Sequence, residues 1–370
     1  MTEKQVLEAL KGKRKVIVLL GPRQVGKTTL MERLAAELEG RVEILNGDFL
    51  DDRDRLKPDR VSLHALVDHI DYLFIDEAQN IPDIGQVLKL IHDQFAHVRV
   101  LATGSSSFDL THRTGEPLTG RQTVFHLYPI AFSERQPRAT TQDTLLTHAM
   151  IYGGYPECIT TPEPENKIRY LKQLVSDYLF KDIYSQVDVN RTKMVDILRL
   201  LAFQIGSEVS FSEVASKVQL DVKTVAKYIG FLEETFILVR LGAFSRNLRK
   251  EVAKSQKFFF TDLGIRNALI NAFNPPHQRD DMGKLWENLL IMERMKHNAY
   301  LARDAAYYFW RTYDRKEIDL IEETSHSLHA FEFKYSSTKK AALPKLWLET
   351  YPESTVEIIT PAHAMRFLTE

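Results

Sequence analysis

The sequence contains a single cysteine, Cys158, among its 370 residues. One cysteine excludes an internal disulfide framework and fits a reducing compartment, so we expect a cytoplasmic protein. No stretch of about 20 apolar residues occurs, which excludes a membrane-spanning helix and predicts no membrane partner. The N-terminal residues lack the apolar run of a signal peptide. The twelve histidines show no spacing typical of metal ligands, so we expect no zinc site.

The chain also has no marked excess of positive or of negative charge. The formal net charge is −1, with 49 basic and 50 acidic side chains. No chain-wide positive field therefore favours nucleic acid, and a nucleic-acid site would have to be a local patch. Hydrophobic residues make up 44% of the chain, which is typical of a globular protein, and the length allows two or three domains.

A glycine-rich loop follows an apolar run that predicts a buried strand over residues 15–20. The loop has the spacing G-x-x-x-x-G-K-T, and a helical pattern follows it as far as Gly40. Glycines let backbone N–H groups turn toward phosphate oxygens, and the helix start adds a positive dipole end. A glycine turn before a helix is the alternative, but strand, loop and helix together favour ATP and Mg²⁺ as ligands. The predicted binding residues are Gly21, Pro22, Arg23, Gln24, Val25, Gly26, Lys27, Thr28 and Thr29.

Within this loop, Lys27 is expected to reach the β- and γ-phosphates, and the Thr28 hydroxyl to bind Mg²⁺. A second acidic element is supplied by YLFIDEAQ at residues 72–79. Asp76 would end a strand at the sheet edge where ligands bind, and would hold Mg²⁺ through water. Glu77 would polarise the attacking water, which is the role that separates a hydrolase from a nucleotide switch. A strand that ends in two acids by chance is the alternative.

A third strand, within residues 97–108, ends in three serines. If it lies beside the first strand, Ser105 or Ser106 would approach the γ-phosphate, although a solvated serine loop is nearly as good an interpretation. Arg121 precedes a further strand and could stabilise transition-state charge, in cis or from a neighbouring subunit. A surface arginine is the equal alternative, and Arg23 is a weaker candidate for the same role.

The middle of the chain predicts helices, interrupted by YGGYP at 152–156 and TPEPE at 161–165. Residues 194–242 then read as three helices and the first strand of a hairpin, with Ser210 and Asp221 as helix caps, Ser210 in a capping box. This is a winged-helix layout in which Lys223, Thr224 and Lys227 face outward. It predicts either contact with the DNA backbone or a module that packs against protein, and the sparse positive charge favours the second.

An acidic set lies near the C-terminus. A helix over residues 284–300 carries Glu287, and strands over 307–312, 315–321 and 329–336 follow it. Asp319 is inside the second strand, whereas Glu332 and Lys334 share one face of the third. Asp319, Glu332 and Glu287 could bind a second Mg²⁺, with Lys334 orienting water or stabilising a pentavalent phosphate. A solvated polar face of an antiparallel sheet is the alternative.

The motifs GPRQVGKTTL, LFIDEAQ, TGSSSF, LTGR, LYPIAFSE and YGGYPE, in this order, resemble the AAA-like ATPases of bacteria and archaea that carry a C-terminal domain of unknown function. The resemblance implies an α/β P-loop domain with a parallel sheet, a helical or winged-helix region, and an α/β module similar to PD-(D/E)XK nucleases. The expected boundaries are 1–138 for the ATPase domain, 139–193 for a helical linker, 194–250 for the winged helix and 251–370 for the nuclease-like module.

We therefore expect an Mg²⁺-dependent ATPase whose nucleotide cycle controls the nuclease-like module. Two alternatives remain: an ATP-dependent regulator that binds DNA or a protein and cuts nothing, and a nucleotide-gated scaffold. Activity at Glu77 and at Asp319, Glu332 and Lys334 would distinguish them. Oligomerisation is compatible with each.

Overall fold

The computed structural model describes residues 2–105, 118–135, 141–186, 190–246, 255–336 and 344–369. The chain divides into two compact units, which are considered separately. Unit 1 comprises Met1–Tyr128 with Glu234–Phe236, and unit 2 comprises Pro129–Glu233 with Ile237–Glu370. No helix in the described part of the chain is both long and apolar enough to cross a membrane.

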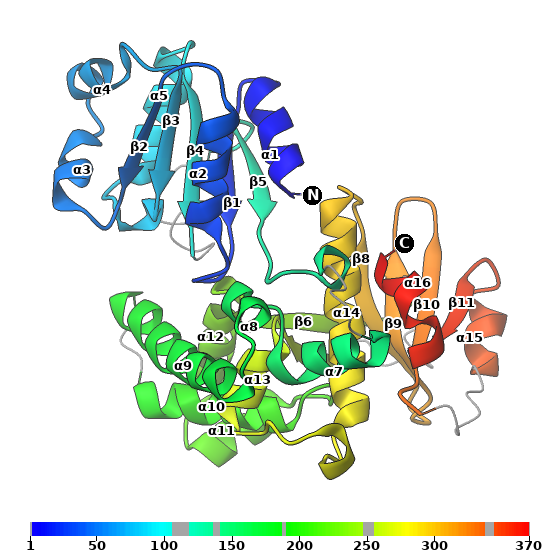
Figure 1. Cartoon of the computed structure of the whole chain (residues 1–370). Coiled ribbons are helices and arrows are strands. Elements are labelled where there is room, and N and C mark those ends of the chain that lie inside the picture. The colour runs from blue at the N-terminus through cyan, green and yellow to red at the C-terminus, as the bar shows by residue number, and fades with distance from the viewer. Residues whose placement is uncertain are drawn as a thin grey trace. The chain divides into compact units, whose positions relative to one another are not determined.

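Unit 1 is built on a parallel sheet with the strand order β2-β3-β4-β1-β5 (Figure 1). Its strands are β1 (Val16–Leu20), β2 (Val42–Asn46), β3 (Tyr72–Asp76), β4 (Arg99–Gly104) and β5 (Gln122–His126). Its helices are α1 (Thr2–Lys11), α2 (Lys27–Glu37), α3 (Leu50–Arg55), α4 (Arg60–Val67) and α5 (Ile84–Gln94), with a 3₁₀ turn at Ala78–Asn80. The expected P-loop fold is present, and β4 lies beside β1 as the sequence predicts.

Alternation along β1 builds the core of unit 1 on both faces of the sheet. Val16, Val18 and Leu20 join an apolar cluster with α4 and α5. Ile17 and Leu19 join a second cluster with α1 and α2. Because both faces are covered, every residue of β1 is buried, which explains the continuous apolar run in the sequence. The carboxyl ends of the strands remain as the edge at which polar loops gather.

Unit 2 combines helices with a second sheet of order β11-β10-β9-β8-β6-β7 (Figure 1). The strands are β6 (Leu238–Phe244), β7 (Gln256–Phe260), β8 (Ala306–Arg311), β9 (Glu317–Glu323), β10 (Leu328–Phe333) and β11 (Thr355–Ile359). The longer helices are α7 (Gln142–Tyr152), α9 (Pro164–Gln186), α10 (Arg191–Phe203), α11 (Phe211–Val218), α12 (Val222–Glu234) and α14 (Met282–Tyr300). The shorter helices are α8 (Pro156–Thr160), α13 (Leu263–Leu269), α15 (Lys345–Thr350) and α16 (Ala364–Thr369).

The three helices and the strand expected over residues 194–242 are present as α10, α11, α12 and β6. Ser210 Oγ accepts a hydrogen bond from Glu213 N at 3.4 Å, and Asp221 Oδ1 accepts one from Thr224 N at 2.9 Å. The Glu213 carboxylate binds Lys217 at 2.6 Å instead of completing a capping box. The strand pair does not stand apart as a wing, because β6 pairs with β7 on one side and with β8 on the other. A boundary at residue 250 therefore falls inside one sheet.

Candidate functional site

The phosphate loop connects β1 to α2 through a backbone that only glycine accommodates at two places. A Cβ on Gly21 would lie 2.2 Å from the carbonyl oxygen of Leu127, so a side chain there would clash with backbone. Gly26 has φ +102°, a conformation that L side chains rarely adopt. α2 begins immediately afterwards, at Lys27. The loop therefore presents a helix start to the space beyond β1.

Lys27 is directed back into this loop. Its Nζ donates hydrogen bonds of 3.0 Å to the carbonyl oxygens of both Gly21 and Pro22, and the residue is only 4% exposed. An ammonium held beside carbonyl oxygens in a buried loop has strong affinity for an anion placed next to it. The arrangement suits the β- and γ-phosphates of a nucleotide.

Asp76 is the last residue of β3, and its carboxylate forms hydrogen bonds with both the phosphate loop region and β4. Its Oδ2 accepts a hydrogen bond from Thr28 Oγ1 at 2.7 Å, and its Oδ1 accepts one from Thr103 Oγ1. Thr103 Oγ1 also accepts a hydrogen bond from the backbone N of Glu77 at 3.2 Å. The structure thus brings together Thr28 and Asp76, the two predicted Mg²⁺ ligands, since a hydroxyl and a carboxylate are the oxygen donors that Mg²⁺ prefers. It adds Thr103, which sequence reasoning did not select.

Glu77 occupies a constrained position directly after Asp76. Its φ is +47°, and a Cβ on Gly47 would lie 2.3 Å from its carbonyl oxygen. The Glu77 carboxylate accepts a hydrogen bond from Gln79 Nε2, which also lies 3.3 Å from Ser105 Oγ. Gln79 therefore lies between Glu77 and Ser105, two residues predicted to be catalytic, and contacts both. Sequence reasoning did not select Gln79, because its contact with Glu77 depends on the 3₁₀ turn at Ala78–Asn80. Ser106 lies outside the described residues.

Arg121 is far from the phosphate loop. Its carbonyl accepts a hydrogen bond from Val16 N at 2.8 Å, at the start of β1, whereas the loop follows Leu20 at the other end. Five strand residues span about 17 Å. Its Nε lies 2.8 Å from Asp93 Oδ1, and this hydrogen bond, followed by that from His92, lowers the Asp93 pKa to about 2. The prediction that Arg121 acts on the nucleotide in cis is therefore wrong, and a role at a neighbouring subunit stays a prediction.

In unit 2 the structure brings the predicted acidic set together. Asp319 Oδ2 accepts a hydrogen bond of 2.7 Å from Phe333 N, and Glu332 accepts one from Lys334 Nζ. Burial, then the charges of Glu287 and Glu332, raise the pKa of Asp319 well above its ordinary value. Burial is likewise the main cause of the raised pKa of Glu287. In both cases the neighbouring carboxylates act in the same direction as burial, because like charges oppose one another's ionisation.

Two further residues complete this acidic cluster, and sequence reasoning missed both. Lys257, on β7, is 2% exposed, and its Nζ lies 3.1 Å from Glu287 Oε1. It also donates a hydrogen bond to Glu317. Burial lowers the Lys257 pKa, but the adjacent Glu287 and Glu317 outweigh it, so the pKa is raised. A lysine followed by three phenylalanines gives little sign of such a role.

Lys257 and Lys334 bind carboxylates of this cluster, so a metal ion would have to share these carboxylates with two lysines. Within the described ranges, no three His, Cys, Asp or Glu side chains are arranged to hold one metal ion. Glu332 Oε2 is buried without a hydrogen-bond partner. A second Mg²⁺ on Glu287, Asp319 and Glu332 stays a prediction.

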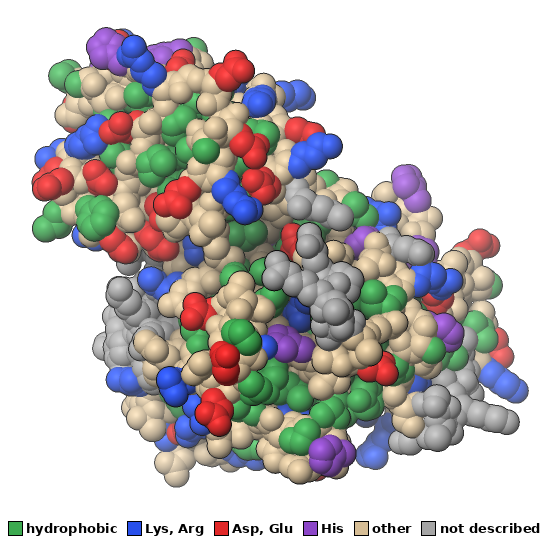
Figure 2. Space-filling model, in the orientation of Figure 1, with side chains coloured by type: hydrophobic (Ala, Val, Ile, Leu, Met, Phe, Trp, Pro, Cys, Tyr) green, Lys and Arg blue, Asp and Glu red, His purple; other side chains and the backbone are tan. Residues whose placement is uncertain are grey.

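The α12 surface is less basic than a DNA-reading helix would be. Lys223 and Lys227 are exposed as expected, but Thr224 is half-buried and its hydroxyl donates to Asp221. Figure 2 shows Lys and Arg side chains interspersed with Asp and Glu on the visible face of each unit. This mixture agrees with the net charge of −1 and gives no broad basic field on that face.

Three family models match successive parts of the chain. An AAA domain model matches residues 13–136, and two models described as Domain of unknown function match residues 143–275 (DUF8612) and 282–364 (DUF4143). An uncharacterized protein of Mycobacterium tuberculosis is 28% identical over 327 residues, which are 87% of this chain and 71% of that protein. One of Methanocaldococcus jannaschii is 20% identical over 333 residues, 83% of this chain and 72% of that protein.

Among solved structures, a Walker-type ATPase of Pyrococcus abyssi superposes with a TM-score of 0.52 at 14% identity. The match covers 72% of this chain and 94% of that one, and at this identity it shows the fold alone. Together with the strand order and the phosphate loop, these findings assign residues 13–136 to an AAA-like P-loop ATPase domain, and the chain also carries a DUF4143 domain over residues 282–364.

Proposed function

We propose that the chain binds ATP with Mg²⁺ at the phosphate loop and hydrolyses it. The observation that carries this proposal is the 2.7 Å hydrogen bond between Thr28 Oγ1 and Asp76 Oδ2, which joins the loop to the acidic strand end. When bound, Mg²⁺ supplies positive charge beside the phosphoryl oxygens. Thr28 would bind it through the hydroxyl oxygen, and Asp76 through water.

The chain's own residues divide the remaining tasks. The backbone N–H groups of the loop and the start of α2 bind phosphate, and Lys27 neutralises charge on the β- and γ-oxygens. Glu77 accepts a proton from the attacking water as general base. Gln79, which contacts both Glu77 and Ser105, orients the carboxylate so that water can lie between it and the serine hydroxyl.

The direct test is Thr28→Val, which keeps the shape of threonine and removes its hydroxyl. Phosphate release should fall at low Mg²⁺, and the Mg²⁺ concentration that gives half the maximal rate should rise by about tenfold, the loss expected for one charge-assisted bond. A parent-like Mg²⁺ dependence would contradict the role of Thr28 at the metal.

For unit 2, we propose that the nucleotide cycle controls a metal-dependent, nuclease-like module. The supporting observation is charge: among the described residues, the ion pairs of Glu287, Glu317 and Glu332 are with Lys257 and Lys334 alone, and Asp319 adds a fourth carboxyl group to the acidic cluster. A largely buried site with two surplus negative charges favours either protons or a divalent cation. Bound Mg²⁺ would activate water for phosphodiester hydrolysis, with Lys334 stabilising the negative charge that develops.

The alternative function is an ATP-dependent regulator that binds DNA or a protein without cutting. One experiment separates the two: the full chain is incubated with ATP, Mg²⁺ and linear, circular or single-stranded DNA, and both phosphate and DNA ends are measured. Cleavage that Asp319→Asn abolishes, with phosphate release intact, supports the nuclease. Phosphate release without cleavage of any DNA form supports the regulator.

A further inference from the structure

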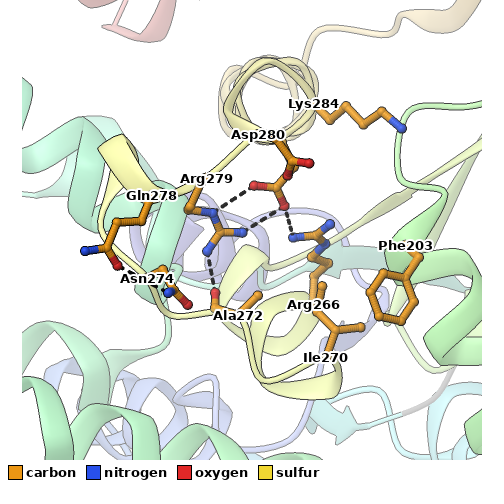
Figure 3. Close-up of a pocket in the computed structure, with 10 residues that line it drawn as sticks. Phe203, Arg266, Ile270, Ala272, Asn274, Gln278, Arg279, Asp280 and Lys284 are labelled. Carbon is orange, nitrogen blue, oxygen red and sulfur yellow. Dashed lines mark hydrogen bonds and ion pairs between the residues drawn. The ribbon is translucent and has the colours of Figure 1, made fainter.

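A pocket of about 440 Å³ lies inside unit 2, between the end of α10, the helix α13 and the start of α14 (Figure 3). Its lining includes Phe203, Arg266, Arg279, Asp281 and Lys284. This volume is in the range of small-ligand sites. None of these residues belongs to the phosphate loop or to the acidic cluster, so neither proposed activity explains the pocket.

The wall of the pocket is a buried arginine pair that shares one carboxylate. Arg266, 2% exposed, places Nη1 2.6 Å from Asp281 Oδ2. Arg279 binds the same carboxylate through Nε and Nη2, each at 2.8 Å. The other acceptors of both guanidinium groups are neutral, for example the Ala202 carbonyl, 2.9 Å from Arg266 Nε. Two buried guanidinium groups therefore share one partly exposed carboxylate.

The exposed side chains at the pocket do not neutralise this excess of positive charge. Asp280 is exposed and acidic, and Lys284 is exposed and basic, so they offset each other. The Lys284 Nζ lies 3.2 Å from Ser207 Oγ and makes no ion pair within the described residues. The five charged side chains thus leave one net positive charge, which favours an anionic ligand.

An aromatic ring stands beside these cations. Phe203 lines the pocket although it is 63% exposed, and Figure 3 shows its ring next to Arg266. A ligand that covered this exposed ring would gain hydrophobic free energy. The side-chain amides of Asn274 and Gln278 add hydrogen-bond donors and acceptors to the lining.

We propose that this pocket binds a nucleoside phosphate, with the phosphate at Lys284 in the positive field of the arginine pair and the base stacked on Phe203. A cation beside an exposed aromatic ring is the combination that binds nucleotides without strict sequence preference. Both a free nucleotide and one unit of a single strand have this chemistry.

The pocket also adjoins the acidic cluster along α14. Lys284 and Glu287 are three residues apart on this helix, which places them on one face about one turn apart. A Cβ on Gly206 would lie 3.0 Å from Glu287 Oε2, while the next residue, Ser207, contacts Lys284. A strand held at Phe203 and Lys284 would therefore extend beside the acidic cluster. Binding itself does not depend on chemistry there.

The test measures binding in EDTA to the full chain carrying Lys27→Ala, so that neither the phosphate loop nor hydrolysis contributes. The probes are a fluorescent single-stranded DNA hexamer, AMP, adenosine and inorganic phosphate. We expect the hexamer or AMP to bind at least about tenfold more tightly than adenosine or phosphate, because stacking and the charged contact each contribute that much. Tight binding of the hexamer alone identifies a strand as the source, and equal binding of AMP identifies a free nucleotide.

Phe203→Ala and Lys284→Ala should each weaken binding of the nucleotide probes by about tenfold. Both side chains are exposed, so these changes leave folding intact. The matched controls are Phe49→Ala, at 62% exposure, and Lys57→Ala, both in unit 1. Absence of binding by every nucleotide probe, or parent-like affinity in both pocket variants, would overturn the proposal. Binding without DNA cleavage in the presence of Mg²⁺ would count against the nuclease and leave the pocket assignment standing.

Discussion

Thr28 and Asp76 are 48 residues apart in the chain, yet the Thr28 hydroxyl donates a 2.7 Å hydrogen bond to the Asp76 carboxylate. The contact arises because β1 and β3 are both neighbours of β4, so their carboxyl ends lie at one edge of the sheet. Two oxygen donors of the kinds that Mg²⁺ prefers are thereby held together before any nucleotide arrives.

Lys27→Ala should weaken ATP binding by at least about tenfold, because a charge-assisted hydrogen bond to phosphate contributes roughly 1.5–3 kcal/mol. Titration calorimetry with a non-hydrolysable ATP analogue would measure the loss. In the parent, Lys27 already lies within 3.0 Å of two loop carbonyls, so its removal also frees the loop. Unchanged affinity would rule out the assigned role of the loop.

Glu77→Gln should retain ATP and slow hydrolysis by about 10²-fold or more, the typical loss of a general base. Glutamine keeps the size of the side chain and a hydrogen bond to Gln79, so binding serves as the internal control. Single-turnover phosphate release separates chemistry from product release. If the variant hydrolyses ATP at the parent rate, another group activates the water, and Ser105 is the first candidate.

The phosphate loop and the DE pair were predictable because each is a local pattern with its own strand. Thr103 and Gln79 were not, since they reach Asp76 and Glu77 only through the pairing of β4 with β3 and a 3₁₀ turn. Arg121 shows the opposite failure: it precedes a strand, and in the expected parallel sheet this position already lies at the end opposite the phosphate loop.

The acidic cluster was predictable in part for a similar reason. Period-2 alternation places acids on one face of β9 and β10, and this periodicity is local. Lys257 comes from β7, which is four strands away from β10 in the sheet order. Its approach to Glu287 depends on the packing of α14, which no short-range pattern encodes.

Gly21→Ala should destabilise unit 1 by about 1–3 kcal/mol, the cost of forcing a methyl group into packed surroundings. The new Cβ would lie 2.2 Å from the Leu127 carbonyl oxygen, a backbone atom that cannot rotate away. Gly230→Ala is the matched control, because Gly230 is inside α12 and no atom beyond its chain neighbours and the nearby backbone of that helix lies within 4 Å of its Cβ position. That change should stabilise by roughly 0.5–1 kcal/mol through helix propensity. Equal effects in urea unfolding would contradict the steric argument.

Asp319→Asn should remove a pH-dependent loss of stability. The folded state raises the Asp319 pKa, chiefly by burial and then by Glu287 and Glu332, so folding favours the protonated form. The stability that this proton provides is complete below the unfolded pKa of about 3.9 and is lost as the pH rises through the folded value. In EDTA the variant should therefore gain stability over the parent as pH increases toward 8. Urea unfolding from pH 4 to 8 tests this, and parallel curves would show that Asp319 does not carry the shift.

Lys257→Met tests whether one buried ammonium holds the acidic cluster together. Lys257 faces Glu287 and Glu317, and methionine keeps its length while removing the charge, which leaves the carboxylates without their main counter-ion. Breaking a buried ion pair in this way costs about 3–5 kcal/mol, and urea unfolding in EDTA at pH 7 should show that loss. Mn²⁺ should restore part of it, because a divalent cation can take over the neutralising role.

The control for Lys257 is Lys217→Met on α11. Lys217 lies 2.6 Å from Glu213 in an exposed i, i+4 pair, so its loss should cost no more than about 0.5 kcal/mol and should not respond to Mn²⁺. The two lysines make the same kind of contact and differ in burial. If Lys257→Met cost no more than Lys217→Met, the carboxylates around it would already be protonated or hydrated at pH 7. The cluster would then have no surplus negative charge for a metal to neutralise, and the argument for a metal-dependent nuclease in unit 2 would fail.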